Sequence, residues 1–205
     1  MPTPDVEATE KKKGGNWIAL AVVAAVTIVA VVLGQQYVKG DAKAADVAAA
    51  GGSSTVSVDG VKPAPKVGDA APTFEATDLD GAKVALEAKR GKPVWMVFMA
   101  TWCTECRIEA PDVQAAHESR DDIDVIAVYL NEDERTAGEY AERVGLTFNQ
   151  IADDSGSIAA AYGVRAIPAH FFIDADGTVQ DVLVGALSAN RIEEAINTVV
   201  ESSDS

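Results

Sequence analysis

The fold is decided by one stretch of sequence, Met99-Ala100-Thr101-Trp102-Cys103-Thr104-Glu105-Cys106-Arg107-Ile108-Glu109-Ala110-Pro111. The apolar run 93–100 that leads into it is typical of a strand buried on both faces. The pattern of 104–117 predicts a helix with Ile108, Val113 and Ala116 on its inward side. The only two cysteines of the chain therefore lie where a buried strand ends and a helix begins.

The position of this Cys-x-x-Cys pair favours thiol exchange. The first turn of a helix presents unpaired N–H groups and the positive end of the helix dipole, which stabilise a thiolate at Cys103. Cys106 lies one turn further along, so its sulfur can close a disulfide with the first. Cys103 is thus expected to attack a partner disulfide and Cys106 to resolve the mixed disulfide. Glu105 is a nearby negative charge that partly opposes the dipole.

Two other uses of the cysteines are weaker. A zinc site needs a second pair of ligands, and His117 and His170 have no ligand spacing to the cysteines. A purely structural disulfide with so short a loop constrains the unfolded chain least. We therefore expect no metal and no cofactor beyond the redox-active disulfide itself.

The rest of the domain alternates strands and helices. A hairpin is expected at 74–76 and 84–86, a buried strand at 124–130 and a helix at 134–144 closed by Gly145. A short helix ending at 162 is expected to be capped by Asp153, Asp154 or Ser155, and a last helix is capped by Ser188 and runs to 200. Between them, 169–173 and 178–184 form a hairpin. This order predicts an α/β fold with a central sheet and helices on both faces.

An apolar segment near the N-terminus predicts a membrane anchor. Residues 17–34 carry no charge, and a helix of this length spans about 27 Å, close to the hydrocarbon thickness of a bilayer. Three lysines precede it, so the positive-inside rule places the N-terminus in the cytoplasm. We expect a cytoplasmic tail at 1–16, a single transmembrane anchor at 17–38, a flexible tether at 39–66 and a globular domain at 67–205. The alternative is a signal peptide cleaved near Ala42-Lys43-Ala44. Both readings put the domain outside the cytoplasm, and the uncleaved anchor holds it at the cell membrane.

Charge excludes one class of partner. Residues 1–66 hold seven lysines and six acids, whereas residues 67–205 hold ten basic and twenty-six acidic residues, a net charge of −16. Nucleic-acid binding depends on clustered Lys and Arg, so no nucleic-acid partner is expected. The acidic surface is read as solvated, with docking of a basic partner as the alternative.

Several motifs together resemble a known family. The active-site stretch, and its Cys-Arg-x-Glu-x-Pro continuation, resemble the membrane-anchored TlpA/ResA branch of thioredoxin-fold proteins, which includes cytochrome c maturation proteins. The stretch Val67-Gly-Asp-Ala-Ala-Pro-Thr-Phe resembles the N-terminal hairpin of that branch. The stretch Tyr162-Gly-Val-Arg-Ala-Ile-Pro resembles its cis-proline loop. The resemblance covers about 67–200 and implies a thioredoxin fold with an N-terminal β-hairpin extension and a central helical insert.

The resemblance also implies roles for single residues. Cys103 is the nucleophile and Cys106 the resolving thiol, with Glu109 as an acid placed to move protons for Cys106. Pro168 is the cis-proline facing the disulfide, where Ile167 pairs with an extended substrate strand. Trp102 packs beside the thiols. The alternative reading of Glu109 is a solvated helix residue.

Three positions depart from related patterns. Thioredoxins carry a buried acid six residues before the first cysteine, and that position is Val97. The dipeptide between the cysteines is Thr-Glu, without the proline common in thioredoxins. Peroxiredoxins need a Thr three residues before the reactive cysteine, and that position is Ala100, so an antioxidant peroxidase is not expected.

The function expected from the sequence is that of a monomeric thiol-disulfide oxidoreductase outside the cytoplasm. It is expected to reduce disulfides in exported proteins such as apocytochrome c and to receive electrons from an integral-membrane thiol donor. A thiol oxidase or isomerase for exported proteins is the first alternative. A copper-binding or redox-sensing module is the second, and it would need His170 as a third ligand.

Overall fold

The computed structural model describes residues 56–58 and 63–203 of the chain. The tail and anchor expected at 1–38, and most of the tether, lie outside these residues. Within the described ranges, no helix combines the length and the apolar character that crossing a membrane requires.

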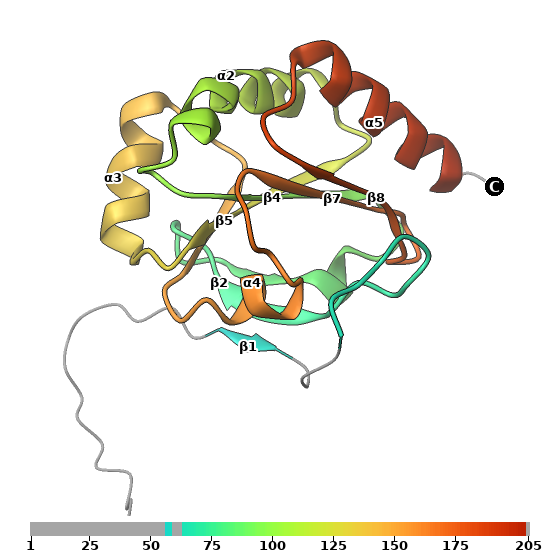
Figure 1. The fold of residues 1–205 in the computed structure, drawn as a ribbon, viewed down its shortest axis with the longest axis horizontal. Coiled ribbons are helices and arrows are strands. Elements are labelled where there is room, and N and C mark those ends of the chain that lie inside the picture. Colours follow the sequence, from blue (N-terminus) through green and yellow to red (C-terminus); the bar gives the residue numbers. More distant parts are fainter. Residues whose placement is uncertain (1–55, 59–62, 204–205) are drawn as a thin grey trace, which may run out of the picture. The chain divides into compact units, whose positions relative to one another are not determined.

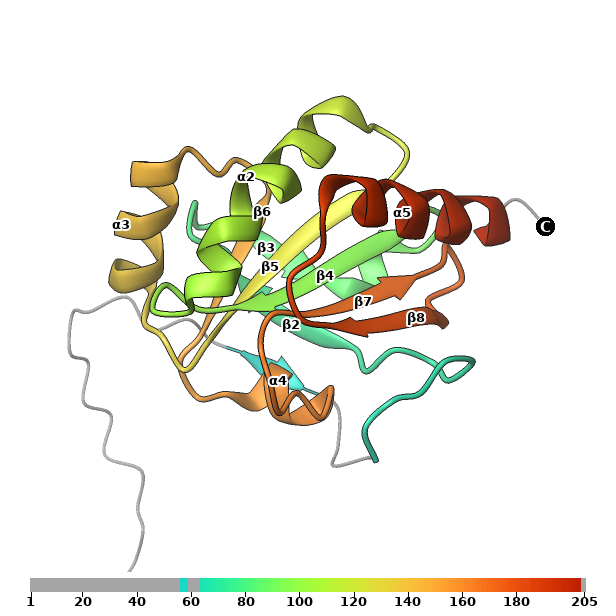
Figure 2. The ribbon, with the colours of Figure 1, turned by 45° about the horizontal axis from the view of Figure 1, so that its top comes forward.

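Five strands form the central sheet, in the order β6-β5-β4-β7-β8 (Figure 2). Their bounds are β4 (Val94–Met99), β5 (Asp124–Leu130), β6 (Asn149–Asp153), β7 (Ala169–Ile173) and β8 (Val179–Val184). Strands β4, β5 and β6 run parallel, and β7 and β8 complete the sheet as an antiparallel hairpin. The α/β arrangement predicted from the sequence is confirmed.

Strand β4 is at the centre of the sheet because its side chains are apolar on both faces. All six residues are buried, and they alternate between two hydrophobic clusters. Trp95, Val97 and Met99 belong to one cluster, and Val94, Met96 and Phe98 belong to the other. A strand apolar on both faces needs a covering layer on each side.

The two faces are covered differently. One face carries three helices, α2 (Thr104–Ser119), α3 (Glu134–Val144) and α5 (Ala189–Ser203) (Figure 1). The other carries the short helix α4 (Ser157–Ala161) and a small antiparallel sheet followed by a 3₁₀ turn, η1 (Leu86–Lys89). The strands of that sheet are β1 (Ser57–Val58), β2 (Phe74–Thr77) and β3 (Lys83–Ala85). The predicted hairpin is therefore present, and α3 with β6 stands as an insert between β5 and α4.

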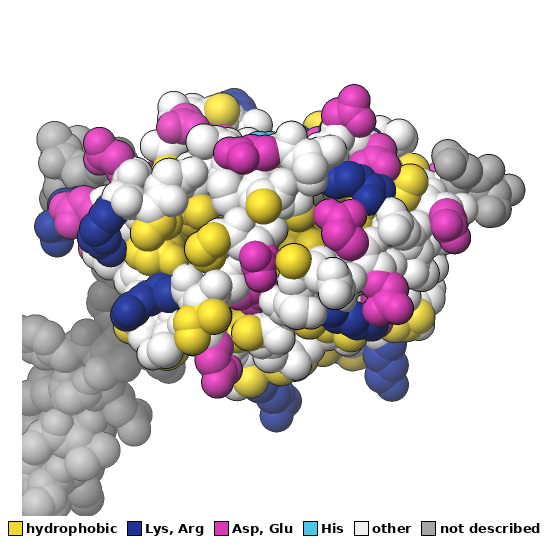
Figure 3. Space-filling view, turned by 90° about the horizontal axis from the view of Figure 1, so that it is seen from above, with side chains coloured by type: hydrophobic (Ala, Val, Ile, Leu, Met, Phe, Trp, Pro, Cys, Tyr) yellow, Lys and Arg dark blue, Asp and Glu magenta, His cyan; other side chains and the backbone are white. Residues whose placement is uncertain are grey.

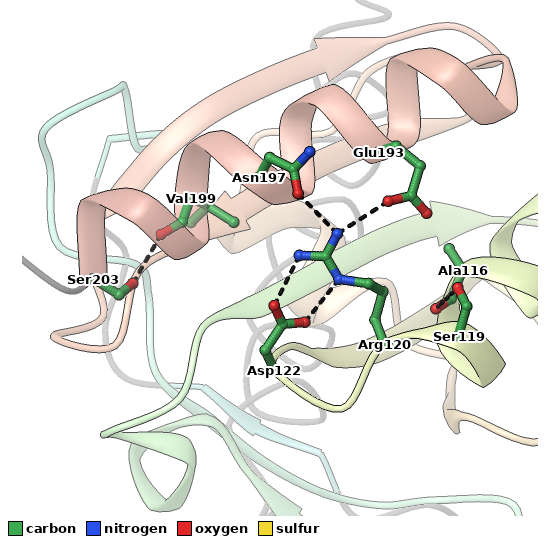
Figure 4. A network of polar contacts seen from close by, with 8 residues as sticks. All are labelled: Ala116, Ser119, Arg120, Asp122, Glu193, Asn197, Val199 and Ser203. Atoms are coloured by element: carbon green, nitrogen blue, oxygen red, sulfur yellow. Dashed lines mark hydrogen bonds and ion pairs between the residues drawn. The ribbon is translucent and has the colours of Figure 1, made fainter.

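Helix α2, which carries the cysteines, is tied to α5 at its far end. Arg120 follows the last residue of α2, and its Nη1 donates to Glu193 at 3.0 Å and to Asn197 at 2.8 Å (Figure 4). Its Nε and Nη2 donate to the two carboxylate oxygens of Asp122 at 2.9 and 2.8 Å. This planar arrangement uses the fixed geometry of the guanidinium group to hold two helices in register.

The predicted helix caps are present. The N-cap position of α4 is Gly156, and the carboxylate of Asp153 supplies the capping side chain by accepting from the backbone N–H groups of Ile158 and Ala159 at 3.2 and 2.9 Å. Ser188 Oγ accepts from the N–H of Arg191 at the start of α5. Gly145 closes α3 with a φ of +73°, a conformation that glycine adopts without strain.

Three details differ from the sequence-based expectations. Ile108 is 69% exposed, because it lies on the opposite side of α2 from the buried residues Cys106 and Ala110. Strand β6 was not predicted, since its polar residues give no apolar run. Ser57–Val58, inside the expected tether, pairs with β2 as a third strand of the small sheet.

Candidate active site

Cys103 is the N-cap of helix α2. The backbone turns sharply after β4, with the N–H of Cys103 donating to the carbonyl of Ala100 at 3.1 Å. The Sγ atom of Cys103 accepts from the backbone N–H of Cys106 at 3.2 Å. A side chain in this position satisfies an unpaired donor of the first turn. The location predicted from the sequence is confirmed, and the same N–H stabilises a Cys103 thiolate after reduction.

The two cysteines form a disulfide with a Cα–Cα distance of 5.3 Å. Cys103 is 8% exposed and Cys106 is 2% exposed. An incoming sulfur therefore has better access to Cys103. The slightly greater exposure of Cys103 and the deeper burial of Cys106 suit an attacking and a resolving thiol, respectively.

The peptide bond between Ile167 and Pro168 is cis. It precedes β7 and brings the Ile167 carbonyl oxygen to 3.9 Å from Cys103 Sγ. Pro168 is buried, while Ile167 is half-buried and packs against the clusters on both faces of the sheet. The structure thus places the Ile167 carbonyl beside Cys103, with the cis Pro168 directly after it in the chain.

Trp102 lies next to Cys103 and differs from its expected environment. Its side chain is 65% exposed, so it covers little of the buried core. An exposed tryptophan beside a reactive sulfur offers apolar surface to a partner. Acidic side chains are dispersed over the face that carries α2 and α5, with apolar groups between them (Figure 3).

Glu132 is a site residue that sequence reasoning missed. It is 7% exposed and follows β5. Its two carboxylate oxygens accept from the backbone N–H and the hydroxyl of Thr101 at 2.9 and 2.5 Å. The side chain therefore holds the loop that leads into Cys103. No spacing in the sequence connects the two residues, because they are 31 positions apart.

Glu109 lies one turn beyond Cys106 on the buried side of α2. It is 2% exposed, and neither of its carboxylate oxygens has a hydrogen-bond partner of good geometry. Burial raises the pKa of Glu109 to about 7, with the backbone of Leu187 opposing the rise and Asp112 adding to it. This carboxyl group can therefore gain or lose a proton near neutral pH.

His170 lies on β7 beneath Glu109 and is completely buried. Its Nδ1 accepts from Trp95 Nε1 at 3.3 Å, and its Nε2 lies 3.3 Å from the Gly185 carbonyl oxygen. The same Nε2 is 3.3 Å from Glu109 Oε1. Burial lowers the pKa of His170 to about 4, with the Gly185 contact opposing it, so the ring is neutral at physiological pH. Both ring nitrogens are occupied by protein groups, which removes His170 as a ligand poised over the cysteines.

Val97, the position of the missing thioredoxin acid, pairs directly with His170 across β4 and β7. The buried polar groups in this region are instead His170 on the neighbouring strand β7 and Glu109 on helix α2. Within the described residues, no group of three or more His, Cys, Asp or Glu side chains is arranged to hold a metal ion.

Comparison with known proteins identifies the family. The model of the AhpC/TSA family matches residues 67–182, more than half of the chain. The chain belongs to the AhpC/TSA family. The curated Thiol-disulfide oxidoreductase ResA from Geobacillus thermodenitrificans is 32% identical over 140 residues, which are 67% of this chain and 80% of that protein. The ResA from Geobacillus kaustophilus is 33% identical over the same shares.

Solved structures of related proteins have the same fold as this AhpC/TSA family member. A protein from Chlorobium tepidum described as a thiol:disulfide interchange protein DsbE has 30% identity and a TM-score of 0.60, covering 67% of this chain and 99% of its own. MTB dsbF, in mixed oxidised and reduced forms, has 32% identity and a TM-score of 0.58, covering 62% and 94%. With the Cys103–Cys106 disulfide, these relatives identify a thiol-disulfide oxidoreductase of thioredoxin fold. Ala100, fully buried, has no hydroxyl to serve a peroxidase at the position where peroxiredoxins need one.

Proposed function

We propose that this enzyme reduces disulfide bonds in exported proteins, apocytochrome c among them, from an anchored position outside the cytoplasm. The observation that carries the proposal is the Cys103–Cys106 disulfide at the start of α2, with Cys103 Sγ 3.9 Å from the carbonyl that precedes the cis-proline. Support for the anchor comes from the uncharged segment 17–34 in the sequence. Support for an exported substrate comes from the family resemblance, and support for thiol-disulfide exchange comes from the relatives named Thiol-disulfide oxidoreductase ResA.

The first half of the reaction starts from the reduced enzyme. The Cys103 thiolate attacks one sulfur of the substrate disulfide, forming a mixed disulfide and releasing the other substrate sulfur as a thiolate. The carbonyl of Ile167 and the exposed ring of Trp102 border Cys103 and are proposed to hold the substrate strand. The helix N-terminus stabilises Cys103 as the attacking group.

The second half needs Cys106 to lose a proton inside a buried site. The Glu109 carboxylate takes that proton, and the Cys106 thiolate attacks Cys103 Sγ. The second substrate sulfur leaves as a thiolate, and the enzyme holds the Cys103–Cys106 disulfide. An integral-membrane thiol donor then supplies two electrons, with Glu109 returning its proton to the Cys106 sulfur. A carboxyl group that titrates near pH 7 can perform both transfers.

The experiment that tests the proposal is trapping of substrates. In Cys106→Ala the resolving thiol is absent, so mixed disulfides with exported proteins are expected to accumulate through Cys103. The matched variant Cys103→Ala is expected to trap few. Equal trapping by both variants would contradict the assignment of the nucleophile. Absence of apocytochrome c from the trapped proteins would remove it as the substrate.

The proposed topology has its own test. A reporter enzyme fused after Ser205 is expected to be active only outside the cytoplasm. Removal of residues 1–38 is expected to release the domain from the membrane. Reporter activity in the cytoplasm would overturn the proposed location and the redox reasoning built on it.

A further inference from the structure

A buried line of polar groups connects the centre of the sheet to Glu109. Trp95 on β4, His170 on β7 and Glu109 on α2 are each at most 2% exposed. Trp95 Nε1 donates to His170 Nδ1 at 3.3 Å, and His170 Nε2 lies 3.3 Å from Glu109 Oε1. These three side chains come from separate elements, so the arrangement depends on tertiary packing.

The tryptophan fixes which nitrogen of His170 carries the proton. An indole N–H can only donate, so Nδ1 of His170 must be the acceptor and remain unprotonated. The proton of the neutral ring is therefore on Nε2. That N–H is in hydrogen-bond contact with the Gly185 carbonyl oxygen at 3.3 Å. Glu109 Oε1 lies at the same distance from Nε2 but outside hydrogen-bond geometry, so a small reorientation would exchange one acceptor for the other.

Gly185, the alternative acceptor to Glu109, is held in place by the cis-proline loop. The N–H of Gly185 donates to the carbonyl oxygen of Pro168 at 2.8 Å. Gly185 has a φ of +98°, a conformation that other residues rarely adopt. Gly185, whose carbonyl oxygen accepts from His170, is thus anchored to the cis-proline through its own N–H, in the preceding peptide group.

Few ionisable groups act on this pair. On α2, Asp112 raises the pKa of Glu109, and Cys106 lies one turn before it in the disulfide. From the segment before α5, only the backbone of Leu187 acts on the carboxyl group. On the strands, the facing groups are the neutral ring of His170, the indole of Trp95 and the apolar side chain of Val97. Among the described residues, no Lys or Arg contributes to the pKa shift of either Glu109 or His170.

We propose that His170 is a positioning residue whose single Nε2–H donates to Glu109 when the carboxyl group is ionised and to Gly185 when Glu109 carries a proton. His170 thereby allows a buried carboxyl group to change its charge without being left unpaired. His170 does not take the proton itself, because Nδ1 is occupied by Trp95. This role rests on the proposed function of Glu109 as the proton acceptor for Cys106.

The direct test is the pH dependence of exchange in full-length variants. The rate of reaction with a disulfide-bonded peptide is measured from pH 5 to 9. In wild type a midpoint near 7 is expected, from Glu109. His170→Phe keeps a ring but loses the donor, so the ionised carboxylate is less stable and the midpoint is expected to rise by about one pH unit. His170→Gln keeps an N–H and is expected to shift the midpoint less.

Controls separate this inference from the proposed function. Tyr162→Phe removes the hydrogen bond from a buried tyrosine to the Pro72 carbonyl on the other face of the sheet, and is expected to leave the midpoint unchanged. If Glu109→Gln keeps the wild-type midpoint, the proposed role of Glu109 fails. If Glu109→Gln abolishes the midpoint but His170→Phe leaves it in place, only the role of His170 fails. Equal shifts in His170→Phe and His170→Gln would show that packing and not the N–H matters, and would also overturn it.

A second measurement needs no variant of His170. The ¹⁵N NMR signals of the His170 ring are expected to show a proton on Nε2 and none on Nδ1 from pH 5 to 9. The Nε2–H signal is expected to shift with a midpoint near pH 7, following Glu109, and this shift is expected to vanish in Glu109→Gln. A proton on Nδ1, or an Nε2–H signal that does not respond to pH in wild type, would overturn the inference.

Discussion

Glu109→Gln is expected to stabilise the protein at pH 8 while slowing the exchange reaction. Burial raises the pKa of Glu109 from an ordinary 4.5 to about 7, so the folded protein holds this proton more tightly than the unfolded chain. Between these two values the folded state binds more protons, and stability falls as the pH rises. Glutamine has nearly the same shape and no proton to lose, so the variant does not carry this penalty.

The size of the effect follows from the pKa shift. Each pKa unit corresponds to about 1.4 kcal/mol of differential interaction, so the shift from 4.5 to about 7 amounts to about 3 kcal/mol. The side chain is 2% exposed, so solvent screening reduces this value little. The difference in unfolding free energy between variant and wild type is therefore expected to grow by about 3 kcal/mol from pH 4.5 to above pH 7.

His170 produces the opposite slope in the same protein. Burial lowers the pKa of His170 from 6.5 to about 4, so the unfolded chain binds more protons between these values. Stability from this residue therefore rises with pH over that window and is lost as the pH falls from 6.5 to 4. Over pH 4.5 to 6.5 the two slopes nearly cancel in wild type. In Glu109→Gln, of these two contributions to the pH dependence of the unfolding free energy, only that of His170 remains.

The assay is urea unfolding of oxidised wild type and Glu109→Gln, from pH 4 to 8.5. The quantity that matters is the difference between the two proteins at each pH, because all other titrating groups are shared. A difference that increases with pH and levels off above pH 7 supports the reasoning. A difference that is the same at every pH would refute the claim that this buried carboxyl group titrates near neutrality.

Two further predictions concern the surface around Cys103. Trp102→Ala is expected to change the unfolding free energy by less than about 0.5 kcal/mol, since the ring is exposed. The same variant is expected to lower kcat/KM for a disulfide-bonded protein about tenfold, because apolar contact with the substrate is lost. An equal loss with glutathione disulfide would contradict a role in docking proteins. Glu105→Gln removes a negative charge from the first turn of α2, so the Cys103 thiolate is repelled less. The reduction potential, measured by equilibration with glutathione, is expected to rise by about 10–30 mV. A lower potential would contradict this electrostatic reasoning.

The sequence predicted the elements whose pattern depends on local burial. The uninterrupted apolar run of β4 favours a strand at the centre of a sheet, and helix α2 follows from the change of pattern after it. Strand β6 has the residues Asn149–Asp153, where Gln150 and Asp153 are buried polar side chains held by hydrogen bonds. Such a strand gives no apolar signal, because its burial is compensated by partners that only the tertiary fold supplies.

The candidate site divides in the same way. The cysteines, Glu109 and the cis-proline lie in stretches with local signatures, and the structure places the Ile167 carbonyl beside Cys103 and buries Glu109 one turn beyond Cys106. His170 was considered from the sequence only as a metal ligand, since nothing in the chain shows that it pairs with Val97 across two strands. Glu132 was not identified from the sequence, because its partner Thr101 is also distant along the chain. Long-range partners of a buried polar group leave no mark in local sequence patterns.

The most direct test of the central claim is the equilibrium reduction potential of the Cys103–Cys106 pair. The helix N-terminus stabilises the reduced form, and the charge of Glu105 opposes it by a similar amount, about 1 kcal/mol each. The near cancellation predicts a potential in the reducing range, roughly −220 to −280 mV against glutathione or dithiothreitol. A value above about −170 mV would contradict the proposed direction and favour a thiol oxidase of exported proteins.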